Sequence, residues 1–216
     1  MPYASSDRQE FIKRSDLKQD ARVLDFGGTL SGELPGAICA LTSPRHVTNA
    51  VLVKPDSLPF KDSTFDAAVS YHYFDLIPSD MQSHMFREIA RVLNREAVFS
   101  FMILLWAPQN EAQRSSLLFS ELLKSTGVLY SHEFEDISRR LFAHGFSEIT
   151  VETVKREITI PRDFIRSHLL MLGELLKKEK EEGGTGIKTL ARQYFAQVNG
   201  HGEAMLPALH FTARRT

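Results

Sequence analysis

Residues 58–93 read LPFKDSTFDAAVSYHYFDLIPSDMQSHMFREIARVL, and this stretch decides the fold. An apolar turn, Leu58–Phe60, leads through a polar connection to the short apolar run Ala67–Tyr71. Such a run is typical of a buried parallel strand. From Pro78 to Leu93 apolar residues recur at helical spacing, and a proline suits the first turn of a helix. The stretch therefore predicts a strand followed by an amphipathic helix.

The rest of the chain continues this alternation of strands and helices. Residues 31–41 could form a helix interrupted by Pro35 and Gly36. Gly145 is expected to end the helix predicted over 134–144. Apolar strands alternating with helices favour a doubly wound, mostly parallel sheet covered on both faces, with antiparallel last strands. Further helices are predicted over 5–19, 111–125, 134–144, 163–180 and 187–198, and further strands over 21–26, 47–53, 97–105, 149–160 and 204–213.

Length and composition restrict the class of protein. A chain of 216 residues suits one α/β domain, here 1–216. The net charge is −1, which favours neither nucleic acid nor an anionic membrane as a partner. The single cysteine, Cys39, fits a reducing compartment, and the apolar runs are too short to span a bilayer. We expect a soluble, cytoplasmic monomer or homodimer without a metal site, because the histidines lack ligand spacing.

The motifs of residues 58–93 resemble those of class I S-adenosylmethionine-dependent methyltransferases of the small-molecule type (type 11, ubiquinone/menaquinone methyltransferase-like). In that family an LPF turn and an FD pair precede the fourth strand, and E-I-x-R-V-L closes the next helix. The resemblance implies a Rossmann-like sheet, S-adenosyl-L-methionine as cofactor and a small-molecule acceptor. It also implies that the helical insertion 163–199 is a cap over the acceptor.

The segment VLDFGGTLSG, Val23–Gly32, lies where the family carries V-L-D-x-G-x-G-x-G. Glycines after a strand let the backbone approach a nucleotide-like ligand. Asp25 and Gly27 match the motif, Gly28 falls one place early, and Thr29 replaces the second motif glycine. The resemblance makes these four residues candidates for cofactor binding.

The part of the chain between Asp25 and Leu58 is short for the family. A βαβ unit takes roughly 30 residues, so there is room for one unit and not for two. We therefore expect a sheet one strand short of the usual seven, with either the second or the third strand missing. No acidic residue stands where the family binds the ribose, because Leu41-Thr42 and Val53-Lys54 occupy the two candidate positions. Asp56 is the nearest carboxylate and is assigned to the cofactor.

The remaining site candidates follow two strands. Open α/β sheets place ligand-contacting groups at the carboxyl ends of strands. His72 and Tyr71 are the catalytic candidates, with His72 as a general base, although His72 could also be merely exposed and the tyrosines core residues. Ser70 is assigned to the cofactor, and Tyr73 and Trp106 to the substrate.

Two functions from different classes remain. The first is a methyltransferase that acts on a small molecule, for which proximity and alignment supply most of the catalysis. The second is a catalytically inactive, methyltransferase-like binding or scaffold protein, favoured by the altered glycines and by Lys54. A weaker third is a pocket for another nucleotide-like or acidic ligand, with charge from Lys54 and Arg45.

Overall fold

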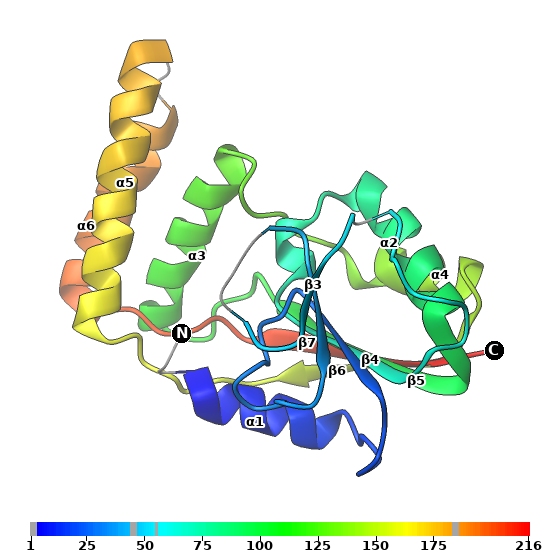
Figure 1. Cartoon of the computed structure of the whole chain (residues 1–216). Helices are drawn as coiled ribbons and strands as arrows, with labels where there is room; N and C mark the ends of the chain where they lie inside the picture. Colours follow the sequence, from blue (N-terminus) through cyan, green and yellow to red (C-terminus); the bar gives the residue numbers. More distant parts are fainter. Residues whose placement is uncertain (1–3, 44–46, 55, 183–185) are drawn as a thin grey trace. The chain divides into compact units, whose positions relative to one another are not determined.

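The structure, a computed structural model, describes residues 4–43, 47–54, 56–182 and 186–216. These residues divide into two compact units, each described here by itself. The larger, sheet unit comprises Ala4–Ile103, His132–Thr153 and Leu209–Thr216 (Figure 1). The smaller, helical unit comprises Leu104–Ser131 and Val154–Ala208. None of the helices among the described residues is long and apolar enough to cross a membrane.

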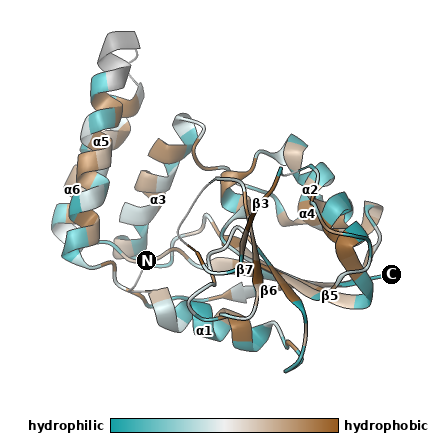
Figure 2. Cartoon of the chain, viewed as in Figure 1, coloured by the Kyte–Doolittle hydropathy of each residue, from teal (hydrophilic) through white to brown (hydrophobic). Residues whose placement is uncertain are grey.

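The sheet has seven strands in the order β3-β2-β1-β4-β5-β7-β6. Neighbouring strands from β3 to β5 are parallel, as the apolar runs predict. Apolar residues follow the central strands (Figure 2), and every residue of β1 is buried. The strands are β1 (Val23–Phe26), β2 (Ile38–Leu41), β3 (Ala50–Leu52), β4 (Phe65–Tyr71), β5 (Leu93–Leu104), β6 (Phe146–Val154) and β7 (Ala208–Arg215).

The helices lie close to the predicted ranges. Asn110 caps one of them by accepting a hydrogen bond from Gln113 N, and Gly145 follows another with a φ of 82°. The helices are α1 (Ser5–Arg14), the 3-10 turn η2 (Phe74–Leu76), α2 (Ser79–Val92), α3 (Glu111–Ser125), α4 (Phe134–Ala143), α5 (Arg162–Glu182) and α6 (Gly186–His201).

Strand β5 shows how the sheet unit is filled on both faces. Successive side chains of a strand point to opposite faces. Phe99 and Phe101 contact Phe86 of α2, and Phe101 stacks on Phe211 of β7 with ring centroids 4.8 Å apart. Between them Ser100 points the other way, and its hydroxyl bonds that of Ser15, just after α1, at 2.7 Å. Helices α1 and α2 therefore cover opposite faces of β5.

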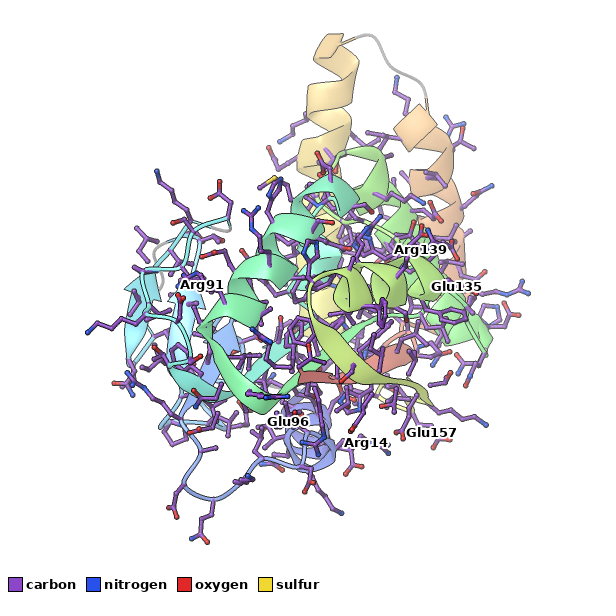
Figure 3. The ribbon with its side chains drawn as sticks, turned by 90° about the vertical axis from the view of Figure 1, so that its right-hand side faces the viewer. Arg14, Arg91, Glu96, Glu135, Arg139 and Glu157 are labelled. Carbon is purple, nitrogen blue, oxygen red and sulfur yellow. The ribbon has the colours of Figure 1, made fainter. Side chains whose placement is uncertain are left out.

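The motif residues of 58–93 form a hydrogen-bonded clamp, with Arg91 at its centre (Figure 3). The Arg91 guanidinium donates to the carbonyl oxygens of Leu58 and Phe60 and to the carboxylates of Asp62 and Glu88, at 2.7–3.0 Å. Glu88 in turn accepts from Leu58 N at 2.9 Å. The clamp joins α2 to the LPF turn, so these motif residues serve the fold.

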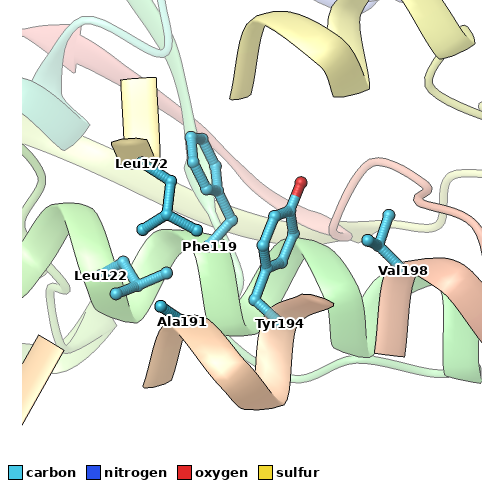
Figure 4. Close-up of a cluster of buried hydrophobic side chains, with 6 residues drawn as sticks. All are labelled: Phe119, Leu122, Leu172, Ala191, Tyr194 and Val198. Atoms are coloured by element: carbon cyan, nitrogen blue, oxygen red, sulfur yellow. The ribbon is translucent and has the colours of Figure 1, made fainter. Parts of the chain in front are cut away.

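The helical unit has a core of its own between α3, α5 and α6. Its largest fully buried side chain is Tyr194, which packs against Phe119 (Figure 4). The buried carboxylate of Glu203 accepts from Ser116, His168 and Tyr194 at 3.0–3.1 Å. Because a buried charge needs such partners, this network stabilises the unit. A role of residues 163–199 as a cap stays a prediction.

Two predictions about residues 21–56 are wrong. The fold class is confirmed, but the sheet has all seven strands instead of six. Residues 31–41 form no helix: Leu34 N bonds Leu30 O in one turn, and Ile38–Leu41 is strand β2. Pro35 and Gly36 stop the helix after that turn. The connection from β1 to β2, residues 27–37, contains a turn and no helix. This part of the chain is therefore short because a helix is missing, and no strand is missing.

Several strand boundaries also differ from the prediction, among them the start of β5 at Leu93 instead of Ala97. β3 is only three residues long, and β6 ends at Val154 although the alternating pattern continues to Ile160. In that continuation Thr159 makes an isolated bridge to Ala204. β7 begins at Ala208, because Pro207 has no N–H to donate to a ladder. The predicted antiparallel direction is confirmed for β7: beside β5, Leu105 N donates to Pro207 O and Arg214 Nη1 to Glu96 O, and beside β6, Thr216 N donates to Gly145 O.

Candidate functional site

The carboxyl ends of β1, β2 and β4 meet at one edge of the sheet. Phe26 pairs with Ala40, and Gly27 N donates to Ala40 O at 2.9 Å. The residues that follow, Gly27-Gly28 and Leu41-Thr42, therefore lie at the same edge. From β1 the chain continues to β2 and β3 on one side of the sheet, and β4 then pairs with the other side of β1. The strand order therefore reverses between β1 and β4. Ligands of open α/β sheets bind at such a point.

The turn after β1 is built for a close backbone approach. Gly27 and Gly28 have φ values of 102° and 63°, a region that other residues rarely adopt. Asp25 fixes the turn, because its Oδ2 accepts from Leu30 N at 2.9 Å. Thr29 donates to the carbonyl oxygen of Tyr71 at 3.0 Å and ties the turn to β4. Four of the six residues predicted to bind the cofactor are thus together.

Asp25 is a buried carboxylate with an incomplete set of partners. It has no exposed surface, and its Oδ1 finds no hydrogen-bond partner within the part of the chain described. Burial raises its pKa to about 6, although hydrogen bonds from Leu30 and Cys39 act in the opposite direction. An unsatisfied buried acceptor is costly and is often found at functional sites.

Tyr73 fills the space over the glycine turn. A Cβ atom built on Gly27 would lie 2.6 Å from Tyr73 Cγ, and one on Gly28 would lie 2.3 Å from Leu41 Cδ2. The Tyr73 ring packs edge-on against Phe26, and its hydroxyl shares a short hydrogen bond with Thr42. Tyr73 is only 6% exposed. The backbone of the turn suits a nucleoside-like ligand, but the Tyr73 ring occupies the space beside Gly27 into which a Cβ would point.

His72 and Asp75 form a dyad just beyond β4. His72 Nδ1 lies 2.7 Å from Asp75 Oδ2, and Asp75 is almost fully buried. His72 has a φ of 57°, and its N–H donates to Met102 O at 2.9 Å. A positive φ at a residue other than glycine costs free energy and clusters at functional sites. A carboxylate on Nδ1 orients an imidazole for proton transfer at its other nitrogen.

Comparison with known proteins agrees with this geometry. Residues 37–101 match the model of the methyltransferase domain family. A cyclopropane-fatty-acyl-phospholipid synthase-like protein from Lactobacillus casei superposes with a TM-score of 0.72 at 13% identity, over 98% of this chain and 90% of that one. An S-adenosylmethionine-dependent methyltransferase from Thermotoga maritima gives 0.60 at 13% identity, over 100% and 90%. The fold is that of a class I methyltransferase.

A third similar structure contains the methyl donor. Phosphoethanolamine N-methyltransferase 2 from Haemonchus contortus, in complex with S-adenosyl-L-methionine, gives a TM-score of 0.57 at 15% identity. The match covers 98% of this chain and 52% of that one. A search of curated protein sequences finds no match. At these identities the structural likeness establishes the methyltransferase fold alone.

Two of the predicted site residues have structural roles at the end of β4. The Ser70 hydroxyl donates to Phe26 O at 2.9 Å and is fully buried, so it bridges β4 to β1. The Tyr71 hydroxyl donates to Asp7 Oδ2 at 2.6 Å and is 3% exposed. Tyr71 therefore anchors α1 to the methyltransferase sheet.

Other predicted site residues are not brought to the glycine turn by any described contact. Asp56 and Lys54 are exposed in the segment after β3, where Ser57 N donates to Lys54 O. Trp106 belongs to the helical unit, where Lys124 Nζ lies 5.1 Å from its ring centroid. Arg45 lies outside the described residues. Within the described chain no group of His, Cys, Asp or Glu residues could hold a metal ion.

Sequence reasoning missed the contacts of three side chains. Asp75 lies three residues after His72, a spacing that could have indicated the dyad. Thr42 stands at the end of β2, in the place of the family's ribose-binding acid. Glu33 accepts from Arg8 and Ser5 of α1 at 2.7 and 3.1 Å, and burial opposes the lowered pKa that the Arg8 hydrogen bond and charge produce. Nothing in the sequence pairs residues so far apart.

Proposed function

We propose that the protein is an S-adenosylmethionine-dependent methyltransferase that acts on a small molecule. The observation that carries the proposal is the turn Gly27-Gly28 at the end of β1, held by Asp25 in a sheet of methyltransferase order. The match of residues 37–101 to the methyltransferase domain supports it. So does the similar Haemonchus contortus enzyme, whose structure contains S-adenosyl-L-methionine.

His72 is the chain's own candidate for handling a proton. A hydroxyl, thiol or ammonium acceptor must lose a proton when it is methylated, and histidine is the side chain whose ordinary pKa lies closest to neutrality. Asp75 Oδ2 lies 2.7 Å from His72 Nδ1 and orients the imidazole. Asp75 is thus a positioning residue and His72 the general base. Tyr73 and Trp106 remain candidates for substrate contact, and Asp56 for the cofactor.

Location and assembly belong to the proposal. Cys39 is a free, buried cysteine, which suits a reducing compartment such as the cytoplasm. We infer a monomer or homodimer, and the near-zero net charge suggests no polyanionic partner.

The test is a calorimetric titration with S-adenosylmethionine and with S-adenosylhomocysteine. We expect both to bind, and we expect His72→Gln to leave the two affinities unchanged while methyl transfer falls by about a hundredfold or more. His84→Gln, at an exposed position of α2, is the matched control. Absence of binding by a folded protein would reject the proposal.

A second candidate is a methyltransferase-like scaffold without activity. Tyr73 over Gly27 and the hydroxyl of Thr42 in place of an acid favour it. In that case neither ligand should bind at millimolar concentration, even when the space over Gly27 is opened.

A further inference from the structure

Tyr73 links two strand ends across the glycine turn. It follows β4 by two positions, yet its hydroxyl bonds Thr42, the residue after β2. Strand β1 lies between β2 and β4 in the sheet. The tyrosine ring therefore crosses the carboxyl end of β1, and its contact with the Cβ position of Gly27 follows from this path.

The chemistry of this contact resembles that of a bound nucleoside. A planar ring lies against the backbone of the turn and edge-on to Phe26, with centroids 5.4 Å apart at 76°. A hydroxyl at its far end reaches a polar group at the end of β2, where a ribose hydroxyl would be bound in the proposed function. Tyr73 thus supplies both a planar ring and a hydroxyl from within the chain.

We propose that Tyr73 is an internal occupant of the cofactor site and must leave it before S-adenosylmethionine binds. The inference rests on the proposed function. The local structure confines the movement to one side chain: the next residue, Phe74, is fully buried and in ring contact with Phe86 and Phe101. Rotation of Tyr73 would leave that aromatic core in place, and Thr42 is exposed and free to be resolvated.

An internal occupant weakens binding by a predictable factor. When only a fraction of the molecules is open, the apparent dissociation constant is the intrinsic one divided by that fraction. Loss of the Thr42–Tyr73 hydrogen bond should raise the open fraction by about two- to tenfold. Loss of the whole ring removes the competition, so the gain in affinity should be about tenfold or more.

The experiment compares the wild-type chain and three variants with two control variants. S-adenosylhomocysteine is titrated into the wild-type chain, Tyr73→Ala, Tyr73→Phe and Thr42→Val, each checked for folding by circular dichroism. Tyr130→Phe and Thr48→Val are the matched controls, since neither side chain contacts the glycine turn in a described interaction. Binding rates are also measured by stopped flow against ligand concentration.

The inference expects tighter binding in the order Tyr73→Ala, then Tyr73→Phe and Thr42→Val, then wild type and controls. The wild-type binding rate should level off at the opening rate, and that of Tyr73→Ala should rise with concentration. If Tyr73→Ala does not fold, the hydroxyl variants decide the outcome.

Two results would overturn the inference in distinguishable ways. Equal affinities throughout, or weaker binding by the Tyr73 variants, would reject the internal occupant while the proposed function stands. Failure of every folded protein to bind would reject the proposed function and the occupant together.

Discussion

Two buried carboxylates, Glu88 and Asp25, show how two segments of this methyltransferase fold differ. We call residues 58–93 the clamp half and residues 21–56 the turn half. Glu88, in the clamp of the LPF turn, is paired with Arg91 at 2.8 Å, and hydrogen bonds from Arg91 lower its pKa. Asp25, beside the glycine turn, is fully buried with Oδ1 unpartnered, and burial raises its pKa to about 6. The carboxylate of the clamp is thus fully partnered, whereas the carboxylate beside the proposed ligand site is not.

The largest expected effect comes from breaking the clamp. Arg91→Ala should lower the free energy of unfolding by about 3–4 kcal/mol, because it leaves the Glu88 carboxylate without its cation and two carbonyl oxygens without their donor. Chemical denaturation measures the loss. Arg95→Ala, whose side chain is exposed, is the control and should change stability by under about 0.5 kcal/mol. A loss below about 1 kcal/mol at Arg91 would contradict the structural role of the motif.

A pH titration of stability tests the other carboxylate. The folded-state pKa of Asp25 lies above its ordinary value of 3.8, so its contribution to stability is complete below pH 3.8 and is lost as the pH rises through about 6. The difference in unfolding free energy, wild type minus Asp25→Asn, should therefore fall by about 3 kcal/mol between pH 3.5 and 8. Asp20→Asn, at an exposed position, is the control. A difference independent of pH would mean that Asp25 is not buried as described.

The sequence predicted the clamp half better than the turn half. Residues 58–93 carry a strand, a Pro-started helix and their connecting motif within one local segment, so periodicity sufficed. In residues 21–56 the prediction assumed that a strand is lost together with its helix, but Ile38–Leu41 pairs with β1 after a helix-free connection. A strand of four residues is too short to show a recognisable sequence pattern, and only its pairing with β1 in the structure identifies it.

The sequence predicted the position of the glycine turn, but it did not predict which side chains contact one another there. Asp25, Gly27 and His72 were found because strand ends carry ligand-facing groups. The contact of Tyr73 with Thr42 joins residues that only the sheet order brings together, and no local pattern encodes it. The bond of Ser70 to Phe26 O was likewise not predictable, because the sequence does not show which neighbour a side chain at the end of β4 contacts.

A double-mutant cycle at the turn sharpens the comparison further. Valine at Gly27 would collide with Tyr73, so loss of ligand binding by Gly27→Val would not test the cofactor site alone. Gly27→Ala should cost about 1–3 kcal/mol in the wild-type background, from the positive φ and from the clash. In the Tyr73→Ala background, Gly27→Ala should have only the backbone cost. The coupling free energy between the two substitutions, measured by denaturation, should therefore be about 1 kcal/mol. Additive effects would place the Tyr73 ring away from Gly27.

The smallest expected effect is that of Lys54, which follows β3 and is exposed. An exposed lysine acts on a cationic ligand through water and salt, so its repulsion is weak. Lys54→Asp should tighten binding of S-adenosylmethionine by about two- to threefold at low salt, and that of S-adenosylhomocysteine less, because it lacks the sulfonium charge. Lys61→Asp, an exposed lysine of the LPF connection, is the control for net charge. The gain should disappear at about 0.5 M salt, where the screening length falls to a few ångströms. A gain of tenfold or more that survives this salt concentration would instead place residue 54 in direct contact with the cofactor, and the turn half would then resemble the family more closely than its sequence suggests.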